Sequence, residues 1–419
     1  MKANLVIENI GQLATGRGVT PLCGEQMKNI DILRNAYIAI SDDTIIAIGE
    51  GECPAEYLME STERRDVGGK LVTPGFIDCH THLVHGGSRE NEFQMKLEGV
   101  PYLDILARGG GILSSVKATR NASFKELKDK AKSSLDRMLL LGVTTVEAKS
   151  GYGLDFETEI KQLEVARFLN QVHPIDIVST YMGAHAIPEE FKGRAEEYAE
   201  FVIKVLPIIK ENNLAEFCDI FCENNIFSVE TSRKILLAAK KLGYGLRIHA
   251  DEIVCLGGAE LAGELGTRTA EHLLAASDEG LKSMVKNGVT SVVLPGTSFN
   301  LGKNYAPARK IIEYGGAVAI ATDYNPGSCP TENLQLVMQI AASQMKLSPK
   351  EVLAGVTQNA AWAVNRSLSV GTIEVGKKAD INIFNSNNLD FIIYHFGINF
   401  IDSVYKNGQL VVSNGQLCY

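Results

Sequence analysis

Two histidines separated by one residue, His80 and His82, are the residues whose types and spacing most directly suggest chemistry. They end the segment FIDCHTH, a short apolar run that follows Pro74 and Gly75. Side chains at positions i and i+2 of a strand point to the same face, so the two imidazoles could bind one metal ion. Such a pair also occurs at ordinary strand ends, so its meaning depends on the rest of the chain.

The composition is that of a globular protein with an acidic balance. Of the 419 residues, 45% are hydrophobic and 22% are charged, which is enough to bury a large core. The formal net charge is -9 and the basic residues are scattered, which argues against nucleic acid as a partner. The sequence has no signal-like segment and no long apolar run, so we expect a cytoplasmic protein without membrane contact. Its eight cysteines are widely spread and predict free thiols rather than disulfides.

Both ends of the chain carry the short alternating apolar runs that are typical of small β-sheets. In the first 73 residues a hairpin turn is expected around residues 41–43. In the last part, Asn407 and Gly408 form a strong signal for a two-residue hairpin turn. We therefore predict one small β-sandwich domain built from residues 1–73 together with 366–419.

Residues 74–365 alternate short apolar runs with helical stretches. Eight of these runs predict strands, with the sequences FIDCHTH, TTVEAKSG, IVSTYMGAH, FCDIFCE, LRIHAD, TRTAEHLL, TSVVLPG and VAIATDYNP. One helix is expected to begin after Ser123, which could form a capping box with Glu126. Eight strand–helix units predict an α/β fold, a (β/α)8 TIM-type barrel, whose chemistry lies at the carboxyl ends of the strands.

Reactive side chains gather at that end of the predicted barrel. The residues at the ends of strands one, three, five, six and eight are His80 with His82, His185, His249, His272 and Asp323. Three imidazoles and a carboxylate, from His80, His82, His249 and Asp323, could hold one metal ion per chain and leave a position for water. Zinc is the default, and iron or manganese accepts the same ligands. A bound metal lowers the pKa of water from about 16 to roughly 7, which favours hydrolysis.

Seven motifs follow one another along the chain: PGFIDCHTHLVHGGSRENEF, RGGGILSSVKATR, EAKSGYGL, GAHAIPEEFKGR, IHADEI, AEHLL and ATDYNPGS. In this order they resemble those of the imidazolonepropionase family within the amidohydrolase superfamily. The resemblance extends over essentially the whole chain. The histidine pair and the aspartate of strand eight are typical of the superfamily, whereas SRENEF, RGGGI, SGYG and DYNPGS are more discriminating.

The resemblance implies a hydrolase of the third step of histidine degradation, which opens the cyclic amide of 4-imidazolone-5-propanoate and gives N-formimidoyl-L-glutamate. It also implies a homodimer, and we expect one divalent or trivalent metal ion, zinc or iron, in each chain. Arg89, in a loop shortly after His82, offers a planar fork for the substrate's carboxylate. By similarity, the other substrate-binding residues are Tyr152, His185, Glu252, Asn325, Gly327 and Ser328.

Three residues are expected to move protons or orient water. Asp323 would take and relay a proton, while His272 and Glu252 would orient the water or protonate the leaving nitrogen. The sequence does not divide these last two tasks, and His272 could instead be a second metal ligand, as in some relatives. Lys149 could bridge two metals if carboxylated, but it lies on the second predicted strand rather than the fourth, so we expect one metal.

Two other classes of function stay open from the sequence. Another cyclic-amide hydrolase or an aminohydrolase deaminase would use the same barrel, although Arg89 argues against a neutral nucleobase because an unpaired buried arginine is costly. A non-catalytic scaffold would keep the barrel without needing a complete ligand set. Cys218 and Cys222 are interpreted as packing residues, since no CxxC pair follows them.

Overall fold

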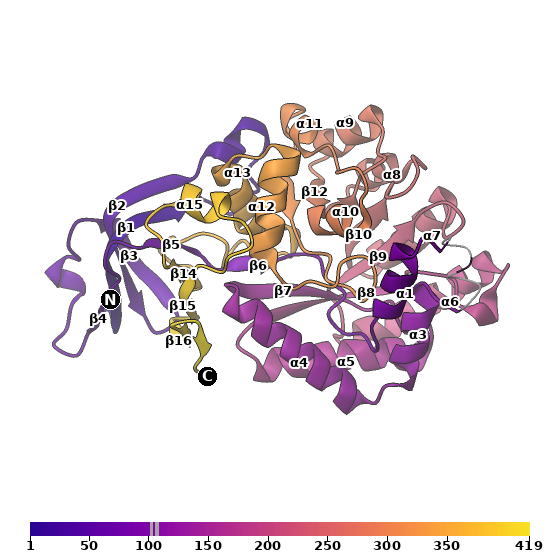
Figure 1. The fold of residues 1–419 in the computed structure, drawn as a ribbon, viewed down its shortest axis with the longest axis horizontal. Helices are drawn as coiled ribbons and strands as arrows, with labels where there is room; N and C mark the ends of the chain where they lie inside the picture. The colour runs from indigo at the N-terminus through magenta and orange to yellow at the C-terminus, as the bar shows by residue number, and fades with distance from the viewer. Residues whose placement is uncertain (101–103, 105–108) are drawn as a thin grey trace.

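The computed structural model describes residues 1–100, 104 and 109–419, so Arg108 of the RGGGI motif lies outside the described residues. Within the described ranges, the chain forms an eight-stranded parallel barrel and a nine-stranded sheet made from its two ends (Figure 1). This confirms the fold class predicted from the sequence. The domain limits, 1–73 with 366–419 and 74–365, stay a prediction.

The barrel strands pair in chain order, each parallel to the next, and every predicted strand is present. The strands are β6 (Phe76–Asp78), β7 (Val143–Lys149), β8 (Asp176–Ala184), β9 (Phe217–Cys222), β10 (Gly245–Ala250), β11 (Thr269–His272), β12 (Thr290–Val293) and β13 (Val318–Ile320). The helices are α1 (Glu90–Leu97), α3 (Ile112–Asn121), α4 (Phe124–Leu140), α5 (Phe156–Val172), α6 (Ala195–Glu211), α7 (Val229–Lys241), α8 (Gly258–Leu265), α9 (Asp278–Lys286), α10 (Pro295–Leu301), α11 (Ala308–Glu313), α12 (Leu334–Met345), α13 (Pro349–Val356), α14 (Gln358–Ala363) and α15 (Leu389–Tyr394).

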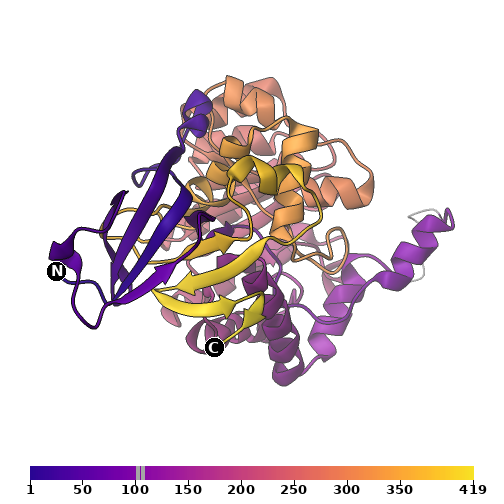
Figure 2. The same cartoon turned by 60° about the vertical axis from the view of Figure 1, so that its left-hand side comes forward.

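The second sheet joins the two ends of the chain. Its strands are β1 (Leu5–Thr15), β2 (Asp31–Ser41), β3 (Thr44–Glu50), β4 (Glu63–Asp66), β5 (Leu71–Pro74), β14 (Ile381–Phe384), β15 (Ile401–Lys406), β16 (Gln409–Ser413) and β17 (Gln416–Leu417). The antiparallel pair β5 and β14 links the N-terminal and C-terminal strands, which lie side by side in Figure 2. Both predicted hairpins are confirmed, and Asn407 and Gly408 have the positive φ angles, 50° and 75°, that a type I′ turn needs.

The first and last barrel strands meet beyond their regular ends. The sequence predicts a strand that continues to His82. In the structure β6 ends at Asp78, so His80 and His82 lie just past it. The chain there stays extended because it is hydrogen-bonded to the segment after β13: the His82 N–H donates to the Tyr324 carbonyl (2.8 Å) and the Asp323 N–H donates to the His80 carbonyl (3.1 Å). The barrel is thus closed at the position of the histidine pair.

Helix α4 begins as the sequence predicts. The Ser123 hydroxyl accepts from the Glu126 N–H, and the Glu126 carboxylate accepts from the Ser123 N–H, which completes the capping box. Leu127, Ala131 and Leu135 recur at a spacing of four and are buried against the barrel. The cap and this apolar stripe together fix where one of the outer helices starts and which side it buries.

We expect Ser123→Ala to lower the free energy of unfolding by about 1 kcal/mol, because a first-turn N–H loses its acceptor. Urea unfolding followed by circular dichroism measures this. Ser133→Ala, an exposed serine in the middle of the same helix, is the control and should change stability by less than about 0.5 kcal/mol. Equal effects from the two substitutions would contradict the role of the cap.

Candidate metal centre

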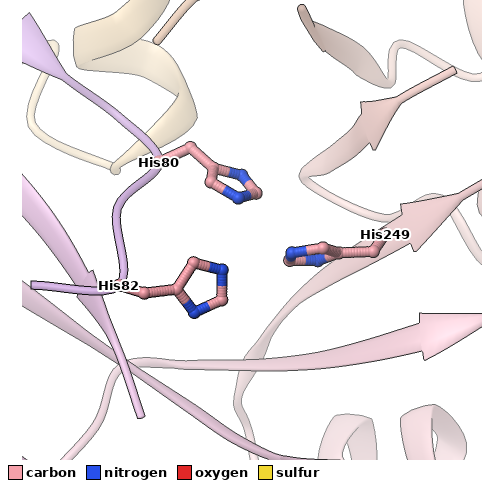
Figure 3. Close-up of side chains that lie close together, drawn as sticks. All are labelled: His80, His82 and His249. Carbon is pink, nitrogen blue, oxygen red and sulfur yellow. The ribbon is translucent and has the colours of Figure 1, made fainter. Parts of the chain in front are cut away.

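Three histidines from opposite sides of the barrel meet at the carboxyl ends of its strands. His80 and His82 follow β6, and His249 lies in β10 and points toward both (Figure 3). One ring nitrogen from each lies within 4.8 Å of the others, and all three side chains are buried. The i and i+2 spacing noted in the sequence therefore does bring two imidazoles to one point, and the fifth strand adds a third.

Asp323 joins this group from the segment after β13. Its Oδ1 lies 3.4 Å from His80 Nε2 and 3.7 Å from His82 Nε2, while its Oδ2 accepts a hydrogen bond from the Thr297 hydroxyl (2.6 Å). Burial opposes ionisation of Asp323, but the nearby His80 and His272 and the hydrogen bond from Thr297 outweigh it and hold its pKa at about 2. The structure thus brings together all four residues that the sequence proposed as ligands, with the aspartate as a carboxylate.

The donor atoms fit a metal ion. Both ring nitrogens of His80 and of His249 are buried without a hydrogen-bond partner among the described residues, although buried polar atoms are normally paired. Their Nδ1 atoms lie beside carboxylates, with His249 Nδ1 3.1 Å from Asp219 Oδ2 and His80 Nδ1 next to Glu271. Histidines that bind metals are commonly held in this way by a carboxylate on their other nitrogen.

His272 and Glu252 lie beside the four candidate ligands. His272, at the end of β11, forms a group with His80 and Asp323, and its Nε2 is 3.6 Å from Glu252 Oε2. Burial lowers the pKa of His272 to about 3, so the imidazole is neutral. Burial, together with the negative charges of Asp323 and Glu223, raises the pKa of Glu252 to about 8. The pair therefore combines a neutral imidazole with a carboxyl group that keeps a proton near neutral pH.

A cavity of about 850 Å³ opens next to these groups. Glu252 and Thr297 line it, and they contact His272 and Asp323 in turn, so the cavity borders the site, although His80, His82, His249 and Asp323 are not part of its lining. Helix α1 forms one wall with Phe93 and Leu97, and residues of α10 form another. Arg89, Gly327 and Ser328, three of the predicted substrate-binding residues, are also part of the lining.

Arg89 is held against Gly327. A Cβ atom at position 327 would lie 1.4 Å from Nη2 of Arg89, so only glycine leaves room for the guanidinium in this position. The Nε of Arg89 is buried and has no hydrogen-bond partner among the described residues. Such an unpaired donor beside a cavity is suited to bind an anionic group.

The other predicted substrate residues lie behind or beside the lining. Tyr152 and His185 are buried against His82: the His185 ring stacks on the His82 ring at 4.7 Å between centroids, and the Tyr152 ring lies 5.6 Å from it. Asn325 shapes the loop after β13, since its Oδ1 accepts from the N–H groups of Gly327 and Ser328, both at 2.8 Å. None of these three belongs to the cavity lining.

Comparison with known proteins agrees with this geometry. The amidohydrolase family model matches residues 71–411. An imidazolonepropionase of Fusobacterium nucleatum is 59% identical over 412 residues, which cover 98% of this chain and 99% of the relative. Another, from Alkaliphilus oremlandii, is 56% identical and both chains are covered in full. This chain belongs to the imidazolonepropionase branch of the amidohydrolase family.

Solved structures with the same fold are more distant in sequence. An adenosine deaminase from Xanthomonas campestris with bound zinc has a TM-score of 0.73 at 17% identity, covering 100% of this amidohydrolase and 94% of its own chain. Ochratoxinase of A. niger has a TM-score of 0.70 at 20% identity, covering 99% and 96% of the two chains. At these identities the likeness shows the fold alone. No described helix of this amidohydrolase is long and apolar enough to cross a membrane.

Sequence reasoning missed the carboxylates behind the histidines. Asp219 and Glu271 were not singled out, and Lys149 was considered only as a possible bridge between metals. In this amidohydrolase Lys149 is ion-paired to both carboxylates, at 2.8 Å and 3.2 Å. The charged residues inside barrel strands were a usable signal, because such positions are normally apolar. The sequence did not indicate, however, which of these side chains would contact one another.

Proposed function

We propose that this chain is a metal-dependent hydrolase that opens the ring of 4-imidazolone-5-propanoate to give N-formimidoyl-L-glutamate. One observation carries the proposal: buried, unpartnered imidazole nitrogens lie close to a cavity that is lined by Arg89, whose Nε has no hydrogen-bond partner among the described residues. The substrate has a cyclic amide, which a metal bound by the imidazoles would activate, and a carboxylate tail, which Arg89 would bind. The names of the curated relatives support the same reaction.

His80, His82, His249 and Asp323 would hold one metal ion. When bound, the ion polarises the ring carbonyl and lowers the pKa of a coordinated water. Zinc and iron both accept this set of nitrogen and oxygen ligands, and the adenosine deaminase that shares this fold was solved with bound zinc. The cytoplasmic location, the homodimer and the two-domain limits remain part of this proposal, since they rest on the sequence and the resemblance.

The side chains around the site divide the remaining tasks. Hydrolysis joins the oxygen of water to the ring carbonyl carbon, breaks its bond to the ring nitrogen and places a proton on that nitrogen. Asp323 is ionised and takes a proton from the water, while Glu252 keeps a proton near neutral pH and gives it to the leaving nitrogen. His272, neutral and next to Glu252, orients the water and the carboxyl group.

The direct test follows the absorbance of imidazolone propionate with purified, metal-loaded protein. We expect it to fall, with N-formimidoyl-L-glutamate as the product identified by mass spectrometry. Adenosine and guanine are tested beside it, since a deaminase would use the same barrel. If adenosine or guanine released ammonia and imidazolone propionate was not consumed, the protein would be a deaminase and the proposal would be wrong. No turnover of any of them would favour a non-catalytic scaffold.

Measuring bound metal in variants should distinguish the proposed metal ligands from the residues that transfer protons. We expect His249→Ala to lose bound metal, because it removes one ligand, and His272→Ala or Glu252→Gln to keep one equivalent while kcat falls about 100- to 10,000-fold. Elemental analysis with steady-state kinetics measures both. His395→Ala, far from the site on the end of α15, is the control and should change neither. Loss of metal from His272→Ala would make that residue a ligand instead.

Gly327→Ala should impair recognition of the carboxylate without disturbing the fold, because the new methyl group displaces only the flexible end of Arg89. We expect kcat/KM to fall about 10- to 100-fold, the value of a hydrogen bond to a charged group. Arg89→Gln should have the same effect. The control is an imidazolone that lacks the propanoate tail: its kcat/KM should be equal in wild type and variants, and an equal loss on this substrate would contradict the role of Arg89.

A further inference from the structure

Five charged side chains fill the barrel interior behind the metal site, where branched apolar residues are usual. They are Glu147 and Lys149 of β7, Asp219 of β9, Arg247 of β10 and Glu271 of β11, and each is at most 1% exposed. Replacing buried ion pairs by apolar residues is often neutral or stabilising. Stability is therefore a poor reason for this cluster, and its position under the histidines points to a function.

Lys149 is the centre of the cluster. Its Nζ lies 3.0 Å from Glu147, 2.8 Å from Asp219 and 3.2 Å from Glu271. Burial and the nearby Arg247 oppose its charge, but the three carboxylates outweigh them and raise the pKa of Lys149. A protonated amine held in this way is not nucleophilic, so it does not take up carbon dioxide to become a bridge between metals.

Two of the carboxylates connect Lys149 to the histidines. The same Asp219 oxygen that contacts Lys149 lies 3.1 Å from His249 Nδ1, and the same Glu271 oxygen pairs with His80 Nδ1. The other Glu271 oxygen accepts from Arg247 Nε at 2.8 Å. A carboxylate that accepts the Nδ1–H of an imidazole fixes the ring's orientation and leaves Nε2 free to bind a metal.

We propose that Lys149 is a positioning residue, whose ammonium group fixes Asp219 and Glu271 so that His249 and His80 present Nε2 to the metal. The amine acts as a built-in cation that balances the charge of the carboxylates around it. This inference rests on the metal site of the proposed function, but it does not depend on the substrate.

The test compares zinc affinity in two variants that each remove a buried lysine from between carboxylates. Lys149→Met should weaken zinc binding about 10- to 100-fold, the usual effect of losing a group that orients metal ligands. The matched control is Lys406→Met, because Lys406 is also buried, 2.7 Å from both Asp176 and Asp380, but lies in β15, away from the histidines. Competition with a chelator measures zinc affinity, and circular dichroism checks the fold.

Variants of the carboxylates keep the test decisive if Lys149→Met does not fold. Glu271→Gln and Asp219→Asn should each weaken zinc binding, because each changes the carboxylate that faces Nδ1 of one histidine. Wild-type zinc affinity in Lys149→Met, an equal loss in Lys406→Met, or a carboxylated Lys149 found by mass spectrometry would overturn the proposal. These measurements need no substrate. If the ring-opening assay failed while the zinc affinities of the variants were as expected, only the proposed reaction would be refuted, and the role of Lys149 would stand.

Discussion

The site depends on the closure of the barrel between its first and last strands. The Asp78 carboxylate accepts two hydrogen bonds from Thr322, at 3.0 Å from the backbone N–H and 2.6 Å from the hydroxyl, across a sequence separation of 244 residues. Just beyond this contact, His80 and Asp323 are hydrogen-bonded through their backbones. The proposed ligands that follow the first and eighth strands can therefore meet only in the closed barrel, and a metal bound between them would stabilise the closed form over the open one.

The chain is strained where the site is built. His272 and Asp323 have φ angles of 71° and 58°, in the left-handed region that residues other than glycine rarely adopt. Asp251, with φ of 50°, shows how such a position is compensated, since its carboxylate accepts the N–H groups of residues 256–259 and fixes the loop that carries Glu252. The large apolar layer between helices and barrel supplies the stability that offsets these costs.

Local patterns made most of the fold predictable. Each barrel strand, both hairpins and the cap at Ser123 depend on residues close in the sequence, and the barrel rule then placed the strand ends together. Strand ends were less predictable: His80 and His82 lie past β6 because hydrogen bonds to the last strand, not local preference, keep them extended. The partners of Lys149 come from two other strands, and no local pattern indicates which strands an interior side chain will reach.

Reactivity and recognition come from different parts of the molecule. The adenosine deaminase and the ochratoxinase share the fold at 17% and 20% identity, so the barrel alone does not choose the substrate. Arg89 and Gly327 lie in the loops that follow β6 and β13, the two strands whose closure brings the ligands together. A change in either loop can alter which group is bound without moving the strands. Because both loops leave the barrel at this junction, a substrate tail bound by Arg89, as proposed, would also be held at a fixed position relative to the proposed metal ligands.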